Sequence, residues 1–172
     1  SFTAADGSDK TTFIHVSDPQ SQSAQQYATF SKVIETAYEM YDEAGFIVNT
    51  GDCVDHGDNF KQWKWFLDGA SETLMNTVMM PASGNHEEKG SNATVTNFTF
   101  SNVPEQDTET GIYYSFDYNN VHVAVLNTND LNDDEMISDE QLEWFIDDMQ
   151  SSDADWKIVT FHKAIYSNGS HY

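Results

Sequence analysis

The chain has 172 residues, and its acidic residues far outnumber its basic ones: 29 Asp and Glu against 7 Lys and Arg give a formal net charge of −22 at pH 7. Hydrophobic residues make up 38% of the chain and aromatic residues 13%, which is enough to bury one sizeable core and argues against wholesale disorder. The charge argues against a nucleic-acid polymer or an anionic membrane surface as a partner, because such partners are bound through Lys and Arg.

The cysteine content and the hydropathy of the chain bear on its cellular location and on whether it enters a membrane. Cys53 is the single cysteine, so the chain can form no internal disulfide and no cysteine-based zinc site. No apolar run approaches the roughly 20 residues that span a bilayer, so we expect no membrane insertion. The acidic composition and the lack of disulfides favour an exported protein, secreted or on the cell surface, of a bacterium.

In the first half of the chain, short apolar runs alternate with amphipathic segments. The predicted elements are, in chain order, a strand at 12–17, a helix at 23–44, a strand at 46–49, a helix at 60–75 and a strand at 78–80. Gly45 is placed to end the first helix, and Asn59 to cap the start of the second. This order is typical of a layered α/β unit with a parallel sheet.

The second half predicts a hairpin, a helix and a final strand. The predicted ranges are strands at 112–118 and 121–128, a helix at 138–149 and a strand at 156–161. Asn119-Asn120 predicts the hairpin turn, and Ser138 with Gln141 forms a capping box at the helix start. The apolar residues of this helix predict its buried face: Leu142, Phe145, Ile146 and Met149.

Polar residues that can bind metal follow four of the predicted strands. They are Asp18 and Gln20, then Asp52 and Asp55, then Asn85 and His86, and finally His162. Any one of them alone is typical of a turn or a surface position. Because the carboxyl ends of parallel strands meet at one edge of a sheet, we expect these side chains to lie close together.

Such a set of side chains suits a pair of divalent cations. Two cations roughly 3.5–4 Å apart need a shared carboxylate, and Asp52 is the natural bridge. Carboxylate and amide oxygens combined with the imidazole of His162 suit manganese, iron or zinc, whereas calcium avoids imidazole and takes more oxygen ligands. The pattern therefore predicts a site with two divalent metal ions (Mn, Fe or Zn) that activates water and binds phosphate oxygens.

Short motifs around these residues carry a resemblance to a known family. The motifs, in order, are Asp18-x-Gln20, Gly51-Asp52-x-x-Asp55-x-Gly57, Gly84-Asn85-His86-Glu87 and the strand-terminal His162. They resemble those of calcineurin-like metallophosphoesterases over about Thr12 to Tyr172, and the chain is similar to the bacterial relatives of purple acid phosphatases. The resemblance implies a layered α/β/β/α fold and the hydrolysis of phosphate mono- or diesters of small phosphorylated substrates.

The resemblance also implies roles for individual residues. Asp18, Gln20 and Asp52 would hold one metal ion. Asp52, Asn85 and His162 would hold the other, with a hydroxide bridging the pair.

The chemistry beside the metal ions is assigned by the same resemblance. His86 would stabilise or protonate the leaving oxygen, and Asp55 would hold its ring by a hydrogen bond. His56 and His171 are the candidate substrate-binding residues.

The chain departs from the family pattern at several positions. Gln20 stands where the first motif usually has His, and His56 where a phosphate-binding Arg is often found. Asp55 stands where purple acid phosphatases have Tyr, so a coloured ferric–tyrosinate site is not expected. The closing Gly-His-x-His motif is absent. We therefore interpret residues 11–172 as a catalytic domain whose C-terminal part is missing, and we expect this fragment to be weakly active or inactive.

Residues 1–10 indicate a boundary. The opening residues resemble the tail of a fibronectin type III domain, so we interpret 1–10 as the end of a preceding domain or a linker.

Two other hypotheses remain from the sequence. The first is a non-catalytic exported surface or binding module that keeps the phosphoesterase fold, which Gln20 and the acidic composition favour. The second is a calcium-binding acidic domain, although the spacing of the acidic residues does not resemble the regular calcium loop of roughly 12 residues.

Overall fold

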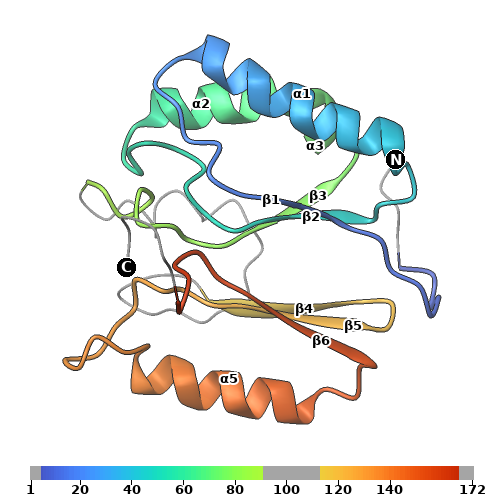
Figure 1. Ribbon diagram of the computed structural model, residues 1–172, viewed down its shortest axis with the longest axis vertical. Coiled ribbons are helices and arrows are strands. Elements are labelled where there is room, and N and C mark those ends of the chain that lie inside the picture. The colour runs from blue at the N-terminus through green and yellow to red at the C-terminus, as the bar shows by residue number, and fades with distance from the viewer. Residues whose placement is uncertain (1–4, 91–112, 167–172) are drawn as a thin grey trace.

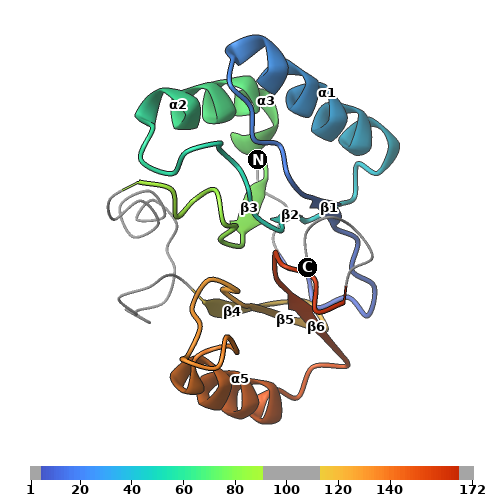
Figure 2. The same ribbon diagram turned by 60° about the vertical axis from the view of Figure 1, so that its left-hand side comes forward.

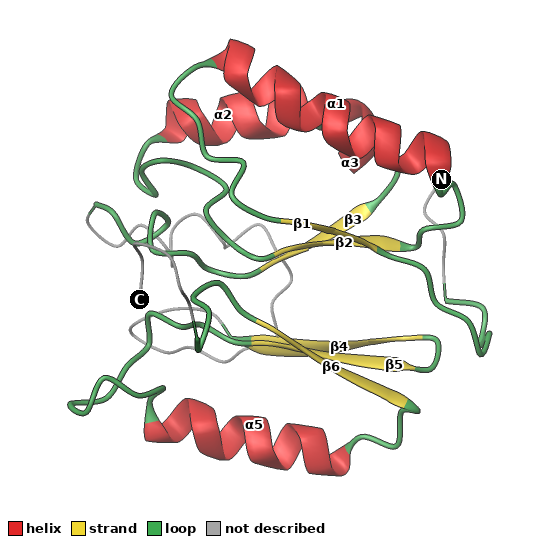
Figure 3. Cartoon of the chain, in the orientation of Figure 1, coloured by secondary structure: helices red, strands yellow, loops and turns green. Residues whose placement is uncertain are grey.

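The computed structural model, described for residues 5–90 and 113–166, contains two three-stranded β-sheets packed face to face between layers of helices (Figure 1). The first sheet holds β1 (Ile14–Val16), β2 (Phe46–Asn49) and β3 (Val78–Pro81), and its helices are α1 (Ala24–Met40), α2 (Phe60–Gly69) and α3 (Ser71–Leu74). The second sheet holds β4 (Tyr114–Tyr118), β5 (Val121–Val125) and β6 (Trp156–Thr160), and it is covered by α5 (Asp139–Ser151). Figures 2 and 3 show the same four layers, so the α/β/β/α architecture is confirmed.

The first sheet brings three strand ends to one edge. β1, β2 and β3 pair in parallel and in that order, with α1 and α2 as the connections between them. Ser23 caps α1 and Asn59 caps α2, each through a side-chain oxygen that accepts backbone N–H groups of the first turn. None of the helices in the described ranges is both long and apolar enough to cross a bilayer.

The second sheet combines a hairpin with a crossover. β4 and β5 are antiparallel around the predicted turn, where Asn119 has a φ of 52°. β6 then pairs in parallel with β5 after the chain has passed through α5. Figure 1 shows β6 ending at the same side of the molecule as the strands of the first sheet. His162, just after β6, accordingly contacts the carbonyl oxygen of Thr50 in the loop after β2 at 2.8 Å.

The core explains why β2 tolerates no polar residue before its last position. All four residues of β2 are buried, because one face packs on helices and the other on the second sheet. Phe46 and Val48 join a cluster between the two sheets, whose other buried members are Ala82, Tyr114, Val121, Val123 and Val125. Ile47 faces the helical side with Ile14 and Ala44.

Two predicted helix ends are wrong. Gly45 does not cap α1, which ends at Met40; instead its backbone lies against Tyr118, and a Cβ at this position would be 2.3 Å from the Tyr118 hydroxyl oxygen. The single helix expected at 60–75 is two helices, because α2 ends at Gly69 and α3 starts at Ser71.

The predicted buried face of α5 is wrong at two of its four positions, whereas Phe145 and Met149 are half-buried. Leu142 and Ile146 are 44% and 43% exposed. Gln141 is buried instead, since its side-chain oxygen accepts the N–H of Asn127 at 2.8 Å and its nitrogen donates to the Asn127 carbonyl at 3.0 Å. Ser138 caps the helix as expected, but Gln141 does not complete the capping box, because its amide serves the loop after β5.

The segment before β1 is bound to the hairpin turn. The N–H groups of Asp6 and Gly7 donate to the Asn119 side-chain oxygen at 2.8 and 3.1 Å, and Asn120 donates to the carbonyl of Asp9 at 3.0 Å. The assignment of residues 1–10 to a preceding domain or linker stays a prediction.

A buried histidine joins α5 to the second sheet. His122 on β5 lies 2.8 Å from an oxygen of Asp117 through Nδ1 and 2.7 Å from an oxygen of Asp148 through Nε2. Burial by itself lowers the pKa of His122, but the hydrogen bonds and charges of Asp148 and Asp117 outweigh it and raise the pKa above its ordinary value. The imidazolium therefore holds a helix carboxylate and a strand carboxylate together.

This contact predicts a pH-dependent stability. A histidine whose pKa is raised on folding contributes stability below its unfolded pKa of about 6.5, and this contribution is lost as the pH rises through the folded pKa. Asp148→Asn should therefore destabilise the protein by about 1–2 kcal/mol at about pH 5.5, mostly through the buried partner Asp148, and by less at about pH 8.5. Urea unfolding at both pH values measures this difference. Asp147→Asn, an exposed neighbour on the same helix, should change neither value, and an equal loss at both pH values for Asp148→Asn would contradict the prediction.

Candidate metal centre

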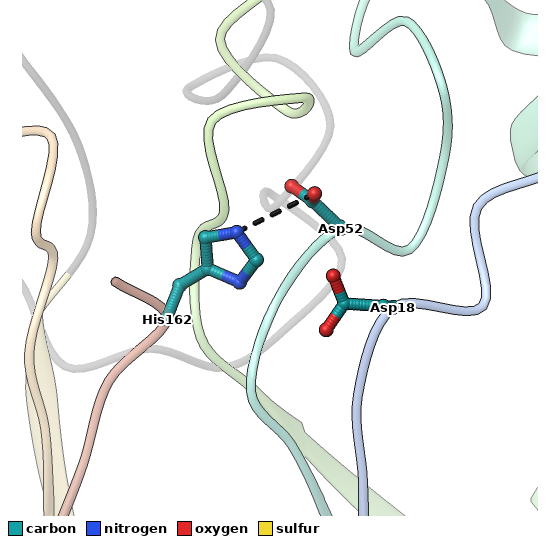
Figure 4. A group of neighbouring side chains, drawn as sticks. All are labelled: Asp18, Asp52 and His162. Atoms are coloured by element: carbon teal, nitrogen blue, oxygen red, sulfur yellow. Dashed lines mark ion pairs between the residues drawn. The ribbon is translucent and has the colours of Figure 1, made fainter. Parts of the chain in front are cut away.

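Three strand-exit side chains converge where both sheets end. Asp18 follows β1, Asp52 follows β2 and His162 follows β6, and each offers a ligand atom within 4.8 Å of those of the other two. Figure 4 shows the three side chains pointing toward one another, with His162 Nε2 3.4 Å from Asp52 Oδ2. These residues are 144 positions apart in the chain at most, since His162 and Asp18 differ by 162 − 18.

The two amide residues lie next to this group. Gln20 donates through Nε2 to Asp52 Oδ2 at 3.1 Å, and its Oε1 is buried without a hydrogen-bond partner in the described part of the chain. Asn85 is exposed, and its Oδ1 lies 3.2 Å from His162 Nε2. The structure thus brings all five predicted ligand residues to one place.

The backbone at the strand exits is strained in a way that aims the carboxylates. Asp18 and Asp52 both have a φ of 55°, a left-handed conformation that non-glycine residues seldom adopt. Two hydrogen bonds hold the loops together, from the Asp18 N–H to the Gly51 carbonyl at 3.1 Å and from the Gln20 N–H to the Asp52 carbonyl at 2.9 Å. The first two exit loops are therefore a single fixed unit.

Two motif glycines are explained by close approach. A Cβ at Gly84 would lie 2.2 Å from Asp52 Oδ1, and a Cβ at Gly51 would lie 2.8 Å from His162 Nδ1. Gly51 also has a φ of 106°, which disfavours any side chain. Small residues are thus required before Asp52 and Asn85, because the exit loops touch one another.

Glu87 is the most important residue whose role sequence reasoning missed. It is fully buried, and its carboxylate accepts the N–H groups of Asp52 at 2.7 Å, Gly84 at 2.8 Å and Val54 at 3.1 Å. Burial raises the pKa of Glu87 to about 7, while the three N–H donors oppose the shift. Glu87, the last residue of the motif Gly84-Asn85-His86-Glu87, thus joins the loop after β2 to the loop after β3 through its hydrogen bonds. Its place inside the motif was the one signal of this role.

His86 and Asp55 are paired as the resemblance implied. His86 Nδ1 lies 3.1 Å from a carboxylate oxygen of Asp55 and 2.9 Å from the Asp55 carbonyl oxygen. His86 Nε2 lies 3.9 Å from Asp52 Oδ2, so the ring stands beside the cluster of Asp18, Asp52 and His162. Lys89, which the sequence did not single out, places Nζ 2.8 Å from His86 Nδ1 and 3.0 Å from Nε2.

Of the two candidate substrate-binding histidines, the structure describes only His56, and it does not bring His56 into the cluster. His56 is exposed, and only its backbone is bonded, by an N–H that donates to the Gln62 side chain at 2.8 Å and a carbonyl that accepts from Asn59. No hydrogen bond or ion pair joins its ring to another residue in 5–90 or 113–166. His171 lies outside the described residues.

The charges of Asp52 and His162 stabilise each other against burial. Burial by itself raises the pKa of Asp52, but hydrogen bonds from His162 and from the His86 N–H lower it below its ordinary value. Burial lowers the pKa of His162, whereas the hydrogen bond and charge of Asp52 raise it above its ordinary value. The Asp52 carboxylate is therefore negatively charged and stabilises a positive charge next to it, here that of the His162 ring.

These residues fit a divalent cation. The Nδ1 of His162 lies 2.8 Å from the Thr50 carbonyl oxygen, so a proton on Nδ1 donates to that carbonyl and Nε2 is turned toward Asp52 and Asn85. The buried Gln20 Oε1 without a partner is a further oxygen donor at the same place. A cation here would replace the proton of His162 as the positive charge beside Asp52.

Comparison with known proteins identifies the family. The calcineurin-like phosphoesterase family matches residues 11–172. The chain belongs to this family. The members of this calcineurin-like family are phosphoesterases by description, which agrees with a metal-dependent phosphoester hydrolase. A comparison with curated proteins found no match.

A solved structure supports the fold of this family member. The chain is similar to the purple acid phosphatase PPD1 from yellow lupin (Lupinus luteus) seeds, with a TM-score of 0.70 and 18% sequence identity. The similarity covers 95% of this chain and 33% of the lupin protein. At this identity the likeness shows the α/β/β/α fold alone, and the chain spans about a third of the lupin protein's length.

Proposed function

We propose that this domain hydrolyses phosphate mono- or diesters of small molecules with a pair of divalent cations. The observation that carries the proposal is the convergence of Asp18, Asp52 and His162 at the strand exits, with the unpartnered Gln20 Oε1 beside them. A chain of net charge −22 repels a phosphorylated substrate unless bound cations invert the local field.

The donor set favours manganese, iron or zinc as the cations. Asp18 and Gln20 would share one cation with Asp52, and Asn85 and His162 the other, because Asp52 lies between the two sets. Such a pair of cations supplies charge to the phosphate oxygens and lowers the pKa of the attacking water. The imidazole donor of His162 disfavours calcium, which prefers a larger set of oxygen ligands.

The protein groups beside the cations supply orientation and a proton. We assign His86 as the group that protonates or stabilises the leaving oxygen, since its ring lies next to the cluster and is fixed by Asp55. Asp52 is held in turn by the His86 N–H, which donates to Oδ1 at 2.9 Å. This hydrogen bond joins His86, the assigned proton donor, directly to Asp52, the assigned metal ligand, and so helps to hold them at a defined separation.

Removal of metal tests the proposal. We expect the complete protein to hydrolyse p-nitrophenyl phosphate, to lose this activity on dialysis against a chelator, and to regain it with Mn(II), Fe(II) or Zn(II) but not with Ca(II). Elemental analysis of the reloaded protein should show two metal ions per chain. Activity that survives complete removal of metal would exclude the proposal.

A non-catalytic binding module remains the second candidate, because Gln20 is a neutral ligand and the exposed His56 stands where the family often has a phosphate-binding Arg. A complete protein that binds two metal ions and hydrolyses neither a monoester nor a diester would favour this module. Export from a bacterial cell and a fibronectin-type domain before residue 11 stay predictions from the sequence.

A further inference from the structure

The protein has few basic residues, and one of them, Lys89, places its ammonium group next to the candidate metal centre. All seven basic residues are lysines, and all lie in the described ranges. Four of them have partners away from the centre: Lys32 with Glu35, Lys61 over Trp65, Lys64 with Asp68 and Lys157 on the Met149 carbonyl. Lys163 follows His162 in sequence, but its ammonium donates to the Thr128 carbonyl at 3.3 Å.

Lys89 is the lysine whose ammonium contacts a candidate site residue. Its Nζ lies 2.8 and 3.0 Å from the two ring nitrogens of His86 and 3.9 Å from an Asp55 oxygen. A neutral imidazole accepts a hydrogen bond at only one ring nitrogen, and Nδ1 faces two Asp55 oxygens, so the ammonium can donate only to Nε2. Because a lysine carries three N–H donors, at least one donor stays available for another acceptor.

The backbone of Lys89 is held by hydrogen bonds, whereas its side chain is partly exposed to solvent. The Lys89 N–H donates to the His86 carbonyl at 3.2 Å, and its carbonyl accepts the N–H of Asp58 at 3.3 Å. The side chain is 38% exposed, so a molecule from solvent can reach the ammonium. Three carboxylates at the centre, those of Asp18, Asp52 and Asp55, repel an anionic ligand, whereas Lys89 would attract one.

We propose that Lys89 binds a non-ester oxygen of the substrate phosphate. The inference rests on the proposed function and deepens it, since it assigns a substrate contact that the motifs do not. With the phosphate held on one side by the cations, the ammonium neutralises the side next to His86, where the leaving oxygen takes up a proton. For His56, by comparison, the described residues show no hydrogen bond or ion pair between the ring and the centre, and its role in substrate binding stays a prediction.

Replacing Lys89 tests the inference in the complete, metal-loaded protein. We expect Lys89→Met to raise KM for p-nitrophenyl phosphate and to weaken the binding of inorganic phosphate, measured by calorimetry, by about tenfold to a hundredfold, the effect of one lost charge-assisted hydrogen bond. Metal content should stay unchanged. Lys89→Arg should restore both values to within about threefold, because the charge is kept.

Lys64→Met is the matched control, because Lys64 is exposed on α2 and paired with Asp68. It should change neither KM nor phosphate affinity. If Lys89→Met does not fold, Lys89→Gln removes the charge while it keeps a polar tip, and the same shifts are expected.

The outcomes separate this inference from the proposed function. Unchanged KM and phosphate affinity in an active Lys89→Met variant would overturn the inference and leave the function standing. A fall in kcat with no change in KM or phosphate affinity would also overturn it, since Lys89 would then position His86. Phosphate binding that depends on Lys89 in a protein without turnover would support the contact and exclude the function. A wild-type protein that hydrolyses the ester with a KM independent of Lys89 and binds no phosphate would overturn the inference and leave the function standing.

Discussion

Asp52→Asn should lower kcat/KM for phosphate esters by about a thousandfold or more and remove at least one of the two metal ions. The substitution keeps the shape of the side chain, including the oxygen that accepts the His86 N–H, but it removes the negative charge between the two ligand sets. Under the proposed function Asp52 would hold both cations, and without its charge they would repel each other. The stabilisation that such cations would give the transition state is worth several kcal/mol, where about 4 kcal/mol equals a thousandfold.

Activity and metal content need to be measured on the same sample of the complete protein. Asp42→Asn is the control, because Asp42 is exposed in the turn after α1 and should leave both values unchanged. An Asp52→Asn protein that keeps two metal ions and stays within tenfold of the wild-type kcat/KM would show that Asp52 is not the bridge.

Glu87→Ala should reduce the free energy of unfolding by about 3 kcal/mol or more, although Glu87 is not assigned as a metal ligand. Its carboxylate is the acceptor for the N–H groups of Asp52, Val54 and Gly84, and each buried donor that loses its acceptor costs about 1–3 kcal/mol. The same change releases the loops after β2 and β3 from each other, so metal affinity should fall together with stability.

Glu87→Gln separates charge from shape. The amide keeps the volume and one acceptor oxygen, but its nitrogen would face a backbone N–H, so we expect a smaller loss of stability than for alanine. Glu39→Gln, on the exposed side of α1, should be neutral. Urea unfolding of the three variants measures the effect, and a Glu87→Ala protein within about 1 kcal/mol of wild type would contradict it.

Most of the fold could be predicted because the spacing of apolar residues along the chain differs between strands and helices. The buried run at β2 and the apolar spacing of α1, with Tyr27, Phe30 and Ile34 inside, are local patterns that the core then uses. The face of α5 could not be predicted from hydropathy. Gln141 is buried and Asp148 half-buried there, because their partners lie in the loop after β5 and on β5 itself, and these partners are distant in the sequence.

Some residues of the candidate metal centre could likewise be predicted from the sequence, and others could not. Motif position pointed to Asp18, Gln20, Asp52 and Asn85, because polar residues directly after neighbouring parallel strands lie at one edge of a sheet. His162 follows β6 in the second sheet, so only the packing of the two sheets brings it to the same place. Lys89 carried no such signal, since it lies three residues past His86 and its ammonium reaches the ring only in the folded turn. The prediction that His56 binds substrate has no support from its exposed position.

By itself, the amino-acid sequence determined the order of strands and helices, the acidic character and the set of ligand types, because each depends on the identity of nearby residues. The tertiary structure alone decided which of these residues touch. The burial of Glu87 beneath two loops, the free oxygen of Gln20 and the approach of Lys89 to His86 depend on contacts between separate strand exits. Such contacts arise only when both sheets are packed, because their partners are brought together by long-range pairing rather than by neighbouring positions in the chain.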